Sequence, residues 1–372
     1  MSDLVVVAMS GGVDSSVAAA LLKEQGYRVI GVTLNVWPEE LSVGVESRHS
    51  ACCSLDSVGD ARRVADRLGI PHYTLNFRDL FESTVIQDFL KEYRRGRTPN
   101  PCVRCNRFVK FEALLERALS WGATWLATGH YARVGRSPDG RFSLAKAADP
   151  SKDQSYALCF LTQEQLAHTL LPLSELTKTE TRVVAARLGL PTAEKPDSQE
   201  ICFVPGNYGD FLRRRVPEVV RPGPIVNRGG DVLGTHQGIA FHTVGQRKGL
   251  GIAAGRPLFV VEIDPERNRV VVGEREDAYS GGLVAEDLNW VSMPEPEGPT
   301  RVGARIRYRS PEVGATAKAQ SDGTLLVQFD EPQRAVTPGQ VVALYQGDAV
   351  IAGGTIRRAI SQQPGAPTQS NS

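Results

Sequence analysis

Short apolar runs alternate with amphipathic stretches along the first half of the sequence. The apolar runs, each of which predicts a buried strand, lie at residues 4–9, 28–34, 72–75 and 125–128. The amphipathic stretches, which predict helices, lie at residues 17–22, 57–68, 80–93, 108–119, 163–170 and 178–188. Strands that alternate with helices indicate an α/β fold with a doubly wound parallel sheet, whose ligand binds at the strand ends.

The pattern changes at about residue 208, where Gly and Pro become frequent. Short alternating segments predict strands at residues 223–226, 239–242, 258–263, 269–272, 303–309, 324–329 and 341–345. This spacing favours small β-rich domains or barrels. We therefore expect an α/β domain at 1–207, a small central β-rich domain at 208–281, a C-terminal β-barrel at 282–360 and a disordered tail at 361–372. The long polar stretch at 37–54 predicts a surface loop.

Composition narrows the class of protein. The 372 residues are enough for two or three domains, and no apolar run is long enough to span a membrane. The first predicted strand begins by residue 4, which leaves no room for a signal peptide, so we expect a cytoplasmic protein. The net charge of +1 gives no overall case for nucleic-acid binding, and the local arginine clusters matter only if they converge in space.

The first predicted strand runs into the glycine-rich loop Ser10-Gly11-Gly12-Val13-Asp14-Ser15-Ser16, just before a helix. A helix start of this kind directs several backbone N–H groups and the positive end of a helix dipole at one spot, which favours a phosphate. Asp14 is a poor direct neighbour for phosphate, so it implies a metal ion between the two or an orienting role. The loop matches neither the Walker P-loop nor the dinucleotide-binding pattern.

The stretch at residues 96–106 contains a proline-bracketed loop and, just past it, two cysteines. Because Pro99 and Pro101 flank Asn100, we expect a stiff, non-helical loop that ends near the start of the next helix. Thiols near a helix start have a lowered pKa, which favours reactive Cys102 and Cys105. The same C-x-x-C spacing also allows half of a zinc site, which Cys52, Cys53 or Cys202 could complete.

Three further segments carry candidate chemistry. Gly129, at the end of the strand at 125–128, allows close approach to a nucleotide, with His130 beside it. Residues 152–156 predict a charged turn that leads into an apolar run, in which Cys159 is predicted to be a core residue. Cys202, considered alone, is more typical of a small buried residue than of a catalyst.

The loop at Ser10–Ser16 resembles the nucleotide loop of the PP-loop ATP pyrophosphatases. The ordered set of motifs is similar to that of the bacterial tRNA-specific 2-thiouridylases over about residues 3 to 358. The motifs are Ser10–Ser16, Thr98–Pro101 with Cys105-Asn106, Ala127–Tyr131, Lys152–Tyr156, Asp197-Ser198 with Ile201–Phe203, Gly245–Ile252 and Thr337–Gln340.

The resemblance implies an enzyme that uses ATP and Mg2+ to form 2-thiouridine at the wobble position of tRNAs for lysine, glutamate and glutamine. It implies that Cys105 is the nucleophile and that Cys202 carries a persulfide supplied by a partner protein. The implied ATP-binding residues are Ala8, Met9, Ser10, Gly11, Gly12, Val13, Asp14, Ser15, Leu34 and Gly129. The implied base-binding residues are Asn100, Pro101 and Cys102, and the implied tRNA contacts are His130, Lys152, Asp153, Gln154, Arg307, Tyr308 and Gln340. We expect a monomer that does not associate with a membrane and has no metal ion bound by its own side chains.

Three alternatives stay open. If Cys102, Cys105 and Cys202 converge, they could hold an iron–sulfur cluster, which would change the sulfur chemistry but not the product. A different PP-loop enzyme, such as one that transfers nitrogen to an activated carbonyl, would need neither Cys105 nor Cys202. A non-catalytic RNA-binding protein would bind tRNA through its β domains without releasing pyrophosphate.

Overall fold

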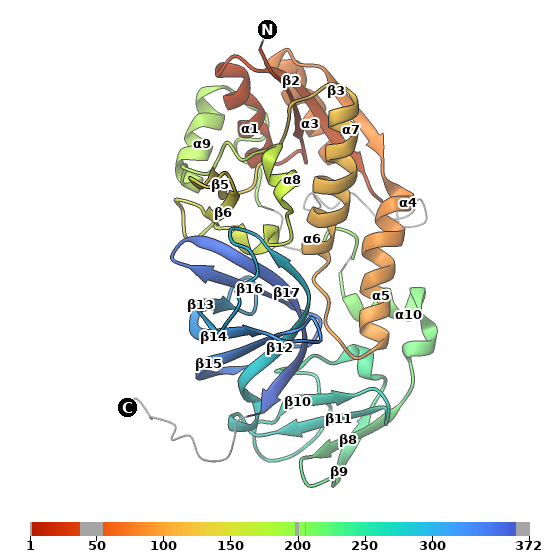
Figure 1. Ribbon diagram of the computed structural model, residues 1–372. Helices are drawn as coiled ribbons and strands as arrows, with labels where there is room; N and C mark the ends of the chain where they lie inside the picture. Colours follow the sequence, from red (N-terminus) through yellow and green to blue (C-terminus); the bar gives the residue numbers. More distant parts are fainter. Residues whose placement is uncertain (1, 38–54, 198–200, 205, 362–372) are drawn as a thin grey trace.

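The computed structural model describes residues 2–37, 55–197, 201–204 and 206–361 (Figure 1). Nearly all of the stretch expected to be a surface loop, with Cys52 and Cys53, lies outside these residues. The tail expected at 361–372 also lies outside them, apart from Ser361, which is the last residue of a strand. Within the described residues, no helix is both long enough and apolar enough to cross a membrane.

The N-terminal domain is built on a parallel sheet of five strands, which confirms the predicted fold class. The sheet order is β3 (His72–Asn76), β2 (Arg28–Asn35), β1 (Leu4–Ala8), β4 (Trp125–Ala127) and β7 (Thr169–Leu170). The chain moves outward from β1 through β2 to β3 and then returns to β4 on the other side of β1. The carboxyl ends of β1 and β4 therefore flank a topological switch point, where ligands bind in open α/β sheets.

Helices cover both faces of this sheet because alternate residues of β1 point to opposite sides. Val5 and Val7 pack with α1 (Val13–Glu24), α3 (Leu55–Leu68) and α9 (Lys178–Arg187). Val6 packs on the other face with α4 (Arg78–Phe81), η1 (Glu82–Ile86), α5 (Gln87–Arg94) and the helix that follows them.

That following helix is continuous from Pro101 to Ser120, as α6 (Pro101–Arg104), η2 (Cys105–Leu114) and α7 (Leu115–Ser120). The expectation of a non-helical loop up to residue 106 is therefore wrong beyond Asn100. Pro101 is compatible with the first helical position, where its missing N–H costs no hydrogen bond. Asn100 caps the helix, because its side chain accepts a 3.3 Å hydrogen bond from the backbone N–H of Val103. From Cys105 to Leu114 the helix has the wider π-helical winding.

The second domain holds a four-stranded sheet in the order β10 (Phe259–Asp264), β11 (Arg269–Gly273), β8 (Gly223–Asn227) and β9 (Val232–His236), reached through α10 (Tyr208–Arg215). The strand expected at residues 239–242 is wrong. Ile239–Phe241 form a single 3-10 turn, in which the N–H groups of Phe241 and His242 bond to Gly238 and Ile239 instead of to a neighbouring strand. A short apolar run does not distinguish a strand from one buried helical turn.

Six antiparallel strands form a closed C-terminal barrel. They are β12 (Tyr279–Trp290), β13 (Thr300–Arg305), β14 (Val313–Ala319), β15 (Leu325–Arg334), β16 (Val341–Gln346) and β17 (Ala349–Ser361), and β12 pairs with β17 to close the ring. The strand expected at 303–309 ends at Arg305, so Arg307 and Tyr308 lie in the turn that follows it. The expected barrel is confirmed, but the sequence pattern missed β12, β14 and β17.

A hairpin of the N-terminal half extends the barrel. Strands β5 (Ala132–Arg136) and β6 (Phe142–Lys146) follow the carboxyl end of β4, and β6 pairs with β17 through Leu144 and Ala145. The N-terminal domain therefore contributes two strands to the edge of the barrel sheet, where the two parts meet (Figure 1). The exact domain boundaries at 207/208 and 281/282 stay a prediction.

Candidate active site

The glycine-rich loop after β1 has the geometry of a phosphate site. Gly12 stands just before α1, and among the described residues no side chain caps it, so the first-turn N–H groups stay available to a ligand. The hydroxyl of Ser15 accepts from the N–H of Ser10 at 3.1 Å, and Ser16 donates to the carbonyl of Gly12 at 2.8 Å, which shape the loop. Gly11 has a φ of +68°, and a Cβ there would lie 2.2 Å from the carbonyl oxygen of Ser57.

The end of β4 meets this loop, as the switch-point topology requires. A Cβ on Gly129 would lie 2.6 Å from backbone atoms of both Asp14 and Ser15. Leu34 lies on β2, two residues beyond Val32, which pairs with Ala8. The structure therefore brings the residues expected to bind ATP to one edge of the sheet.

Asp14 is held by two side chains from other parts of the chain. Its Oδ1 accepts from the hydroxyl of Tyr131 at 2.8 Å and from the ammonium group of Lys178 at 2.6 Å. Burial, followed by the charge of Asp14, raises the pKa of Tyr131 well above its usual value, so the hydroxyl stays a donor. Sequence reasoning missed Lys178, because a lysine at the start of a helix carries no local sign of a partner so distant in the chain.

Lys178 also contacts Asp197, five residues before Cys202. Its ammonium group lies 2.8 Å from Asp197, whose carboxylate also pairs with Lys152 at 2.8 Å and Arg182 at 3.3 Å. Burial alone would raise the pKa of Asp197, but hydrogen bonds from Lys152 and Lys178 outweigh it and lower the pKa. A chain of charged contacts thus joins the nucleotide loop to Asp197, which precedes Cys202 by five residues in the sequence.

Cys105 and Cys202 border the same hydrophobic core, and both are half-buried. Phe203 anchors Cys202 by packing among three buried rings, with ring centroids 5.6 Å from Phe81, 5.2 Å from Phe89 and 5.6 Å from Phe211. The next segment, α10, carries Phe211 and continues this packing. The two candidate catalytic thiols are therefore fixed by packing against one cluster.

The other described cysteines differ in their surroundings. Cys102 lies in the first turn of the helix and is exposed, so the helix-start position belongs to Cys102, whereas Cys105 lies one turn further on. Cys159 is fully buried, which confirms it as a core residue, and burial raises its pKa to about 12. The described part of the chain has no group of three or more His, Cys, Asp or Glu side chains placed to hold a metal ion, so Cys102, Cys105 and Cys202 do not converge there.

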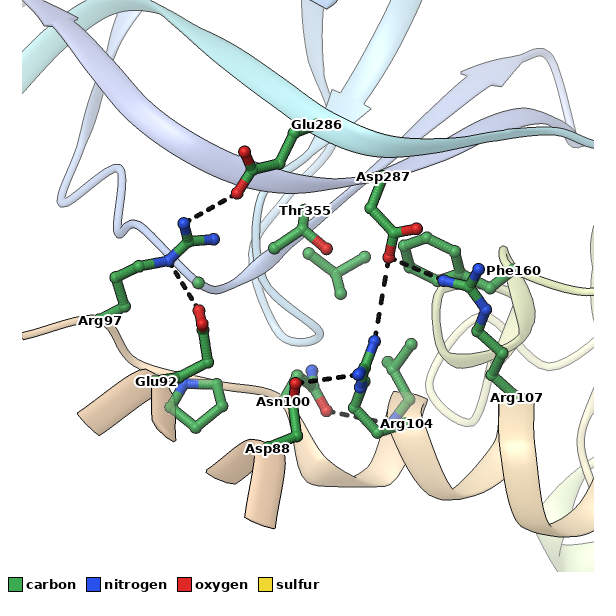
Figure 2. Close-up of a pocket in the computed structure, with 14 residues that line it drawn as sticks. Asp88, Glu92, Arg97, Asn100, Arg104, Arg107, Phe160, Glu286, Asp287 and Thr355 are labelled. Atoms are coloured by element: carbon green, nitrogen blue, oxygen red, sulfur yellow. Dashed lines mark hydrogen bonds and ion pairs between the residues drawn. The ribbon is translucent and has the colours of Figure 1, made fainter. Parts of the chain in front are cut away.

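A cavity of about 330 Å3 separates the helix start from strands β12 and β17 of the barrel (Figure 2). Its polar walls are ion pairs. Arg104 lies 2.9 Å from Asp88, and Arg107 lies 2.7 Å from Asp287. Burial raises the pKa of Asp88. Because carboxylates oppose these arginines, the arginine clusters near Cys105 do not make a bare positive surface.

Asn100 lines the same cavity and is oriented at both ends. Its side chain caps the helix and is also hydrogen-bonded to Tyr156, whose hydroxyl donates to the carbonyl of Val341 in the barrel at 2.8 Å. Pro101, beside it, is buried. Asn100 is therefore presented in one orientation.

Several residues expected to contact tRNA make defined contacts within the chain. The side chain of Asp153 is 2% exposed and pairs with Arg305 at 2.9 Å, and Gln154 accepts from the N–H of Tyr131 at 3.0 Å. Arg307 donates to the carbonyl of Arg334. These contacts make Asp153 in particular a residue that can act on RNA only through its neighbours.

Tyr308 and His130, which were also expected to contact tRNA, differ in exposure and charge. Tyr308 is 40% exposed, in the turn after β13. His130 lies with Nδ1 2.7 Å from the hydroxyl of Thr128, and burial, followed by the charge of Lys110, holds its pKa well below the usual value. His130 is therefore a neutral imidazole at physiological pH.

The fold and site define a class: a nucleotide-binding α/β domain whose glycine-rich loop lies at the switch point of the parallel sheet, followed by two β domains. Three family models match in chain order: a tRNA methyl transferase HUP domain at residues 3–206, a tRNA methyl transferase PRC-barrel domain at 209–274 and an aminomethyltransferase beta-barrel domain at 280–356.

Curated relatives match nearly the whole chain. The tRNA-specific 2-thiouridylase MnmA of Symbiobacterium thermophilum is 55% identical over 361 residues, 96% of this chain and 93% of the relative. That of Moorella thermoacetica is 57% identical over 353 residues, 94% of this chain and 98% of the relative. The chain therefore belongs to the tRNA-specific 2-thiouridylase family, a family of sulfurtransferases.

The solved structures that match this chain cover a smaller part of it than the curated relatives do. A 4-thiouridine synthetase–RNA complex with bound ATP covers 58% of this chain and 51% of its own, at 20% identity and a TM-score of 0.34. An overlap of this extent bears on neither fold nor function.

Proposed function

We propose that this chain is an ATP-dependent tRNA sulfurtransferase that forms 2-thiouridine at the wobble position of tRNAs for lysine, glutamate and glutamine. The observation that carries the proposal is the chain of charged contacts from Asp14 through Lys178 to Asp197, which joins a phosphate loop to a residue five positions before Cys202. Relatives named as 2-thiouridylases over nearly the full length support the same reaction.

ATP is a substrate in this reaction. The C2 oxygen of uracil is a poor leaving group, so it must first be converted to an adenylate with release of pyrophosphate. The loop from Ala8 to Ser15, with Leu34 and Gly129, would bind the nucleotide, and the open N–H groups of α1 would bind its phosphates. Lys178 and Tyr131 both donate to Oδ1 of Asp14, so Oδ2, the other oxygen of this carboxylate, would be the ligand for Mg2+, which would neutralise charge on the phosphates.

Sulfur would arrive as a persulfide on Cys202, supplied by a partner protein. Either the terminal sulfur attacks C2 directly, or the Cys105 thiolate attacks the persulfide and frees hydrosulfide, which then attacks C2. In both routes AMP leaves C2. In the direct route the Cys105 thiolate then attacks the Cys202 sulfur and breaks its bond to the transferred sulfur, which stays on C2. Both routes therefore end in a Cys105–Cys202 disulfide, which an external thiol reduces.

The target base would be bound by Asn100, Pro101 and Cys102, at the start of the helix that carries Cys105. A base that reacts must leave the anticodon stack, so a rigidly capped loop suits its pocket. His130, Lys152, Gln154, Arg307 and Tyr308 would contact tRNA, whereas Asp153 and Gln340 would act by positioning their neighbours. We propose a cytoplasmic monomer that takes tRNA and a persulfide donor as its partners.

The test is direct. The protein is incubated with unmodified glutamate tRNA, ATP, Mg2+ and a persulfide donor, and the digested RNA is analysed for 2-thiouridine by mass. We expect product from the wild type and none from Cys105→Ser or Cys202→Ser. Cys159→Ala, a change in the core, serves as the matched control and should retain the reaction if the variant folds.

Each alternative has its own outcome. Full activity in a Cys105→Ser, Cys202→Ser double variant would indicate a PP-loop enzyme of different chemistry. Binding of tRNA without release of pyrophosphate would indicate an RNA-binding protein. The family models are described as methyl transferases, and a mass increase that matches an added methyl group, not sulfur in place of oxygen, would support that activity.

A further inference from the structure

Thr98 and Pro99, which precede the helix that carries Cys105, are held in position by residues of the barrel. The side-chain amide of Gln340, just before β16, donates to the carbonyl of Thr98 at 3.0 Å and to that of Pro99 at 3.1 Å. The N–H of Thr98 donates in turn to the carbonyl of Pro338 at 2.8 Å. Pro99 has no N–H to donate, so the backbone hydrogen bonds of Thr98 and Pro99 that the structure shows are all made with residues 338 and 340, just before β16.

A second set of contacts from the barrel reaches the helix (Figure 2). Glu286 on β12 lies 2.8 Å from Arg97, and its neighbour Asp287 lies 2.7 Å from Arg107 and 3.9 Å from Arg104. Asp287 has a φ of +52° within an irregular stretch of the β12–β17 pairing. Asn289 fixes that stretch, because its amide donates to the carbonyls of Cys159 and Leu161, both at 3.0 Å.

These contacts bear on sulfur transfer because they hold the residues next to Asn100 and Cys105. Asn100 follows Pro99 directly, and Arg104 and Arg107 stand on either side of Cys105. The amide of Gln340 has two hydrogens, and the two carbonyls use both. Its nitrogen therefore has no donor left for RNA, although the resemblance assigned this residue to tRNA contact.

We propose that Gln340 and Asp287 are positioning residues, through which the barrel sets the placement of Asn100 and Cys105. The inference rests on the proposed function and assigns the barrel a part in the chemical step in addition to tRNA binding. Small displacements of reacting groups are costly, so loosening this contact lowers the rate of sulfur transfer more than it lowers tRNA affinity.

The first experiment uses Gln340→Met, which keeps the length of the side chain and removes its donors. Gln346→Met is the matched control, since the Gln346 amide also binds a backbone carbonyl of the barrel, that of Arg301 at 3.1 Å. In single-turnover reactions we expect Gln340→Met to lower the thiolation rate by about tenfold or more, with the tRNA Kd within about twofold of the wild type. Weaker tRNA binding, or an unchanged rate, overturns the proposal.

A second readout does not depend on the reaction. Alkylation of the tRNA-free protein by iodoacetamide, followed residue by residue by mass spectrometry, should become faster at half-buried Cys105 in Gln340→Met but not in Gln346→Met. Cys159 is fully buried and should stay protected in both, which excludes general unfolding. An equal rate at Cys105 in the two variants overturns the proposal. Absence of 2-thiouridine from the wild type would instead refute the proposed function, and alkylation would still test the positioning.

Asp287→Asn tests the contact with the helix. Asn also tolerates a positive φ, so the substitution removes the charge and keeps the backbone. Asp330→Asn is the control, because Asp330 pairs with Arg301 elsewhere on the barrel, at 2.7 Å. We expect a lower single-turnover rate and an unchanged tRNA Kd for Asp287→Asn but not for Asp330→Asn. Equal rates in the two variants would show that Asp287 is not a positioning residue.

Discussion

The ammonium group of Lys178 lies 2.6 Å from Oδ1 of Asp14, a residue of the nucleotide loop. The Lys178 side chain is only 12% exposed and also contacts Asp197 at 2.8 Å. One largely buried cation therefore lies between two carboxylates at the carboxyl edge of the sheet. A polyphosphate bound at this loop brings more negative charge toward Lys178, so this residue would take part in binding it.

We expect Lys178→Met to weaken ATP binding. Loss of a charge-assisted hydrogen bond costs about 1.5–3 kcal/mol, which corresponds to a rise in Kd of roughly tenfold to a hundredfold. Equilibrium binding of ATP to the tRNA-free protein measures the change, and Lys178→Arg should restore part of the affinity. Arg187→Gln is the control, because Arg187 lies on the same helix in an exposed pair with Glu24. Equal affinity in Lys178→Met and Arg187→Gln would show that Lys178 plays no part in nucleotide binding.

Gly129→Ala tests the close approach of β4 to the nucleotide loop. A Cβ would lie 2.6 Å from backbone atoms of Asp14 and Ser15, so the loop must move away. Overpacking of this kind costs about 1–3 kcal/mol, and we expect at least part of it to appear as weaker ATP binding. Gly298→Ala is the control, since a Cβ there meets no described atom within 4 Å. Unchanged ATP affinity in Gly129→Ala would separate this contact from the nucleotide site.

Cys102 and Cys105 are three residues apart but differ in exposure. Cys102 is exposed in the first turn of the helix, and a serine there keeps the backbone and nearly the size of the side chain beside the base. We therefore expect Cys102→Ser to keep the thiolation rate within about threefold of the wild type. Cys105→Ser should give no product. Loss of activity in Cys102→Ser, together with visible absorbance from anaerobically purified wild type, would support the iron–sulfur hypothesis instead.

The parallel sheet and the nucleotide loop could be predicted because their signals are local. An apolar run, a glycine pair and a helix start lie within about twenty residues of Leu4. The helix start at Pro101 was missed because a proline usually ends a helix, and only the cap from Asn100 shows that it begins one here.

Contacts between distant residues could not be predicted in this way. The hairpin of β5 and β6 finds its partner strand near the end of the chain, and nothing in residues 132–146 indicates β17. Lys178 and Gln340 are similar cases, because each gains its role from partners that the fold brings near. The family motifs indicated Gln340, but only the fold shows that its amide donates to the Thr98 and Pro99 carbonyls.

His242 in the second domain predicts a dependence of stability on pH. Its side chain is buried, with its ring 5.6 Å from that of His236, and burial followed by the charge of His236 lowers its pKa from 6.5 to about 4. Between these values the unfolded chain binds a proton that the folded chain does not, so stability is complete above about pH 6.5 and falls as the pH is lowered toward 4. His242→Phe keeps an aromatic ring and removes this proton. We therefore expect the thermal unfolding midpoint to fall less between neutral pH and about pH 5 in His242→Phe than in the wild type. An equal fall in both proteins would contradict the prediction.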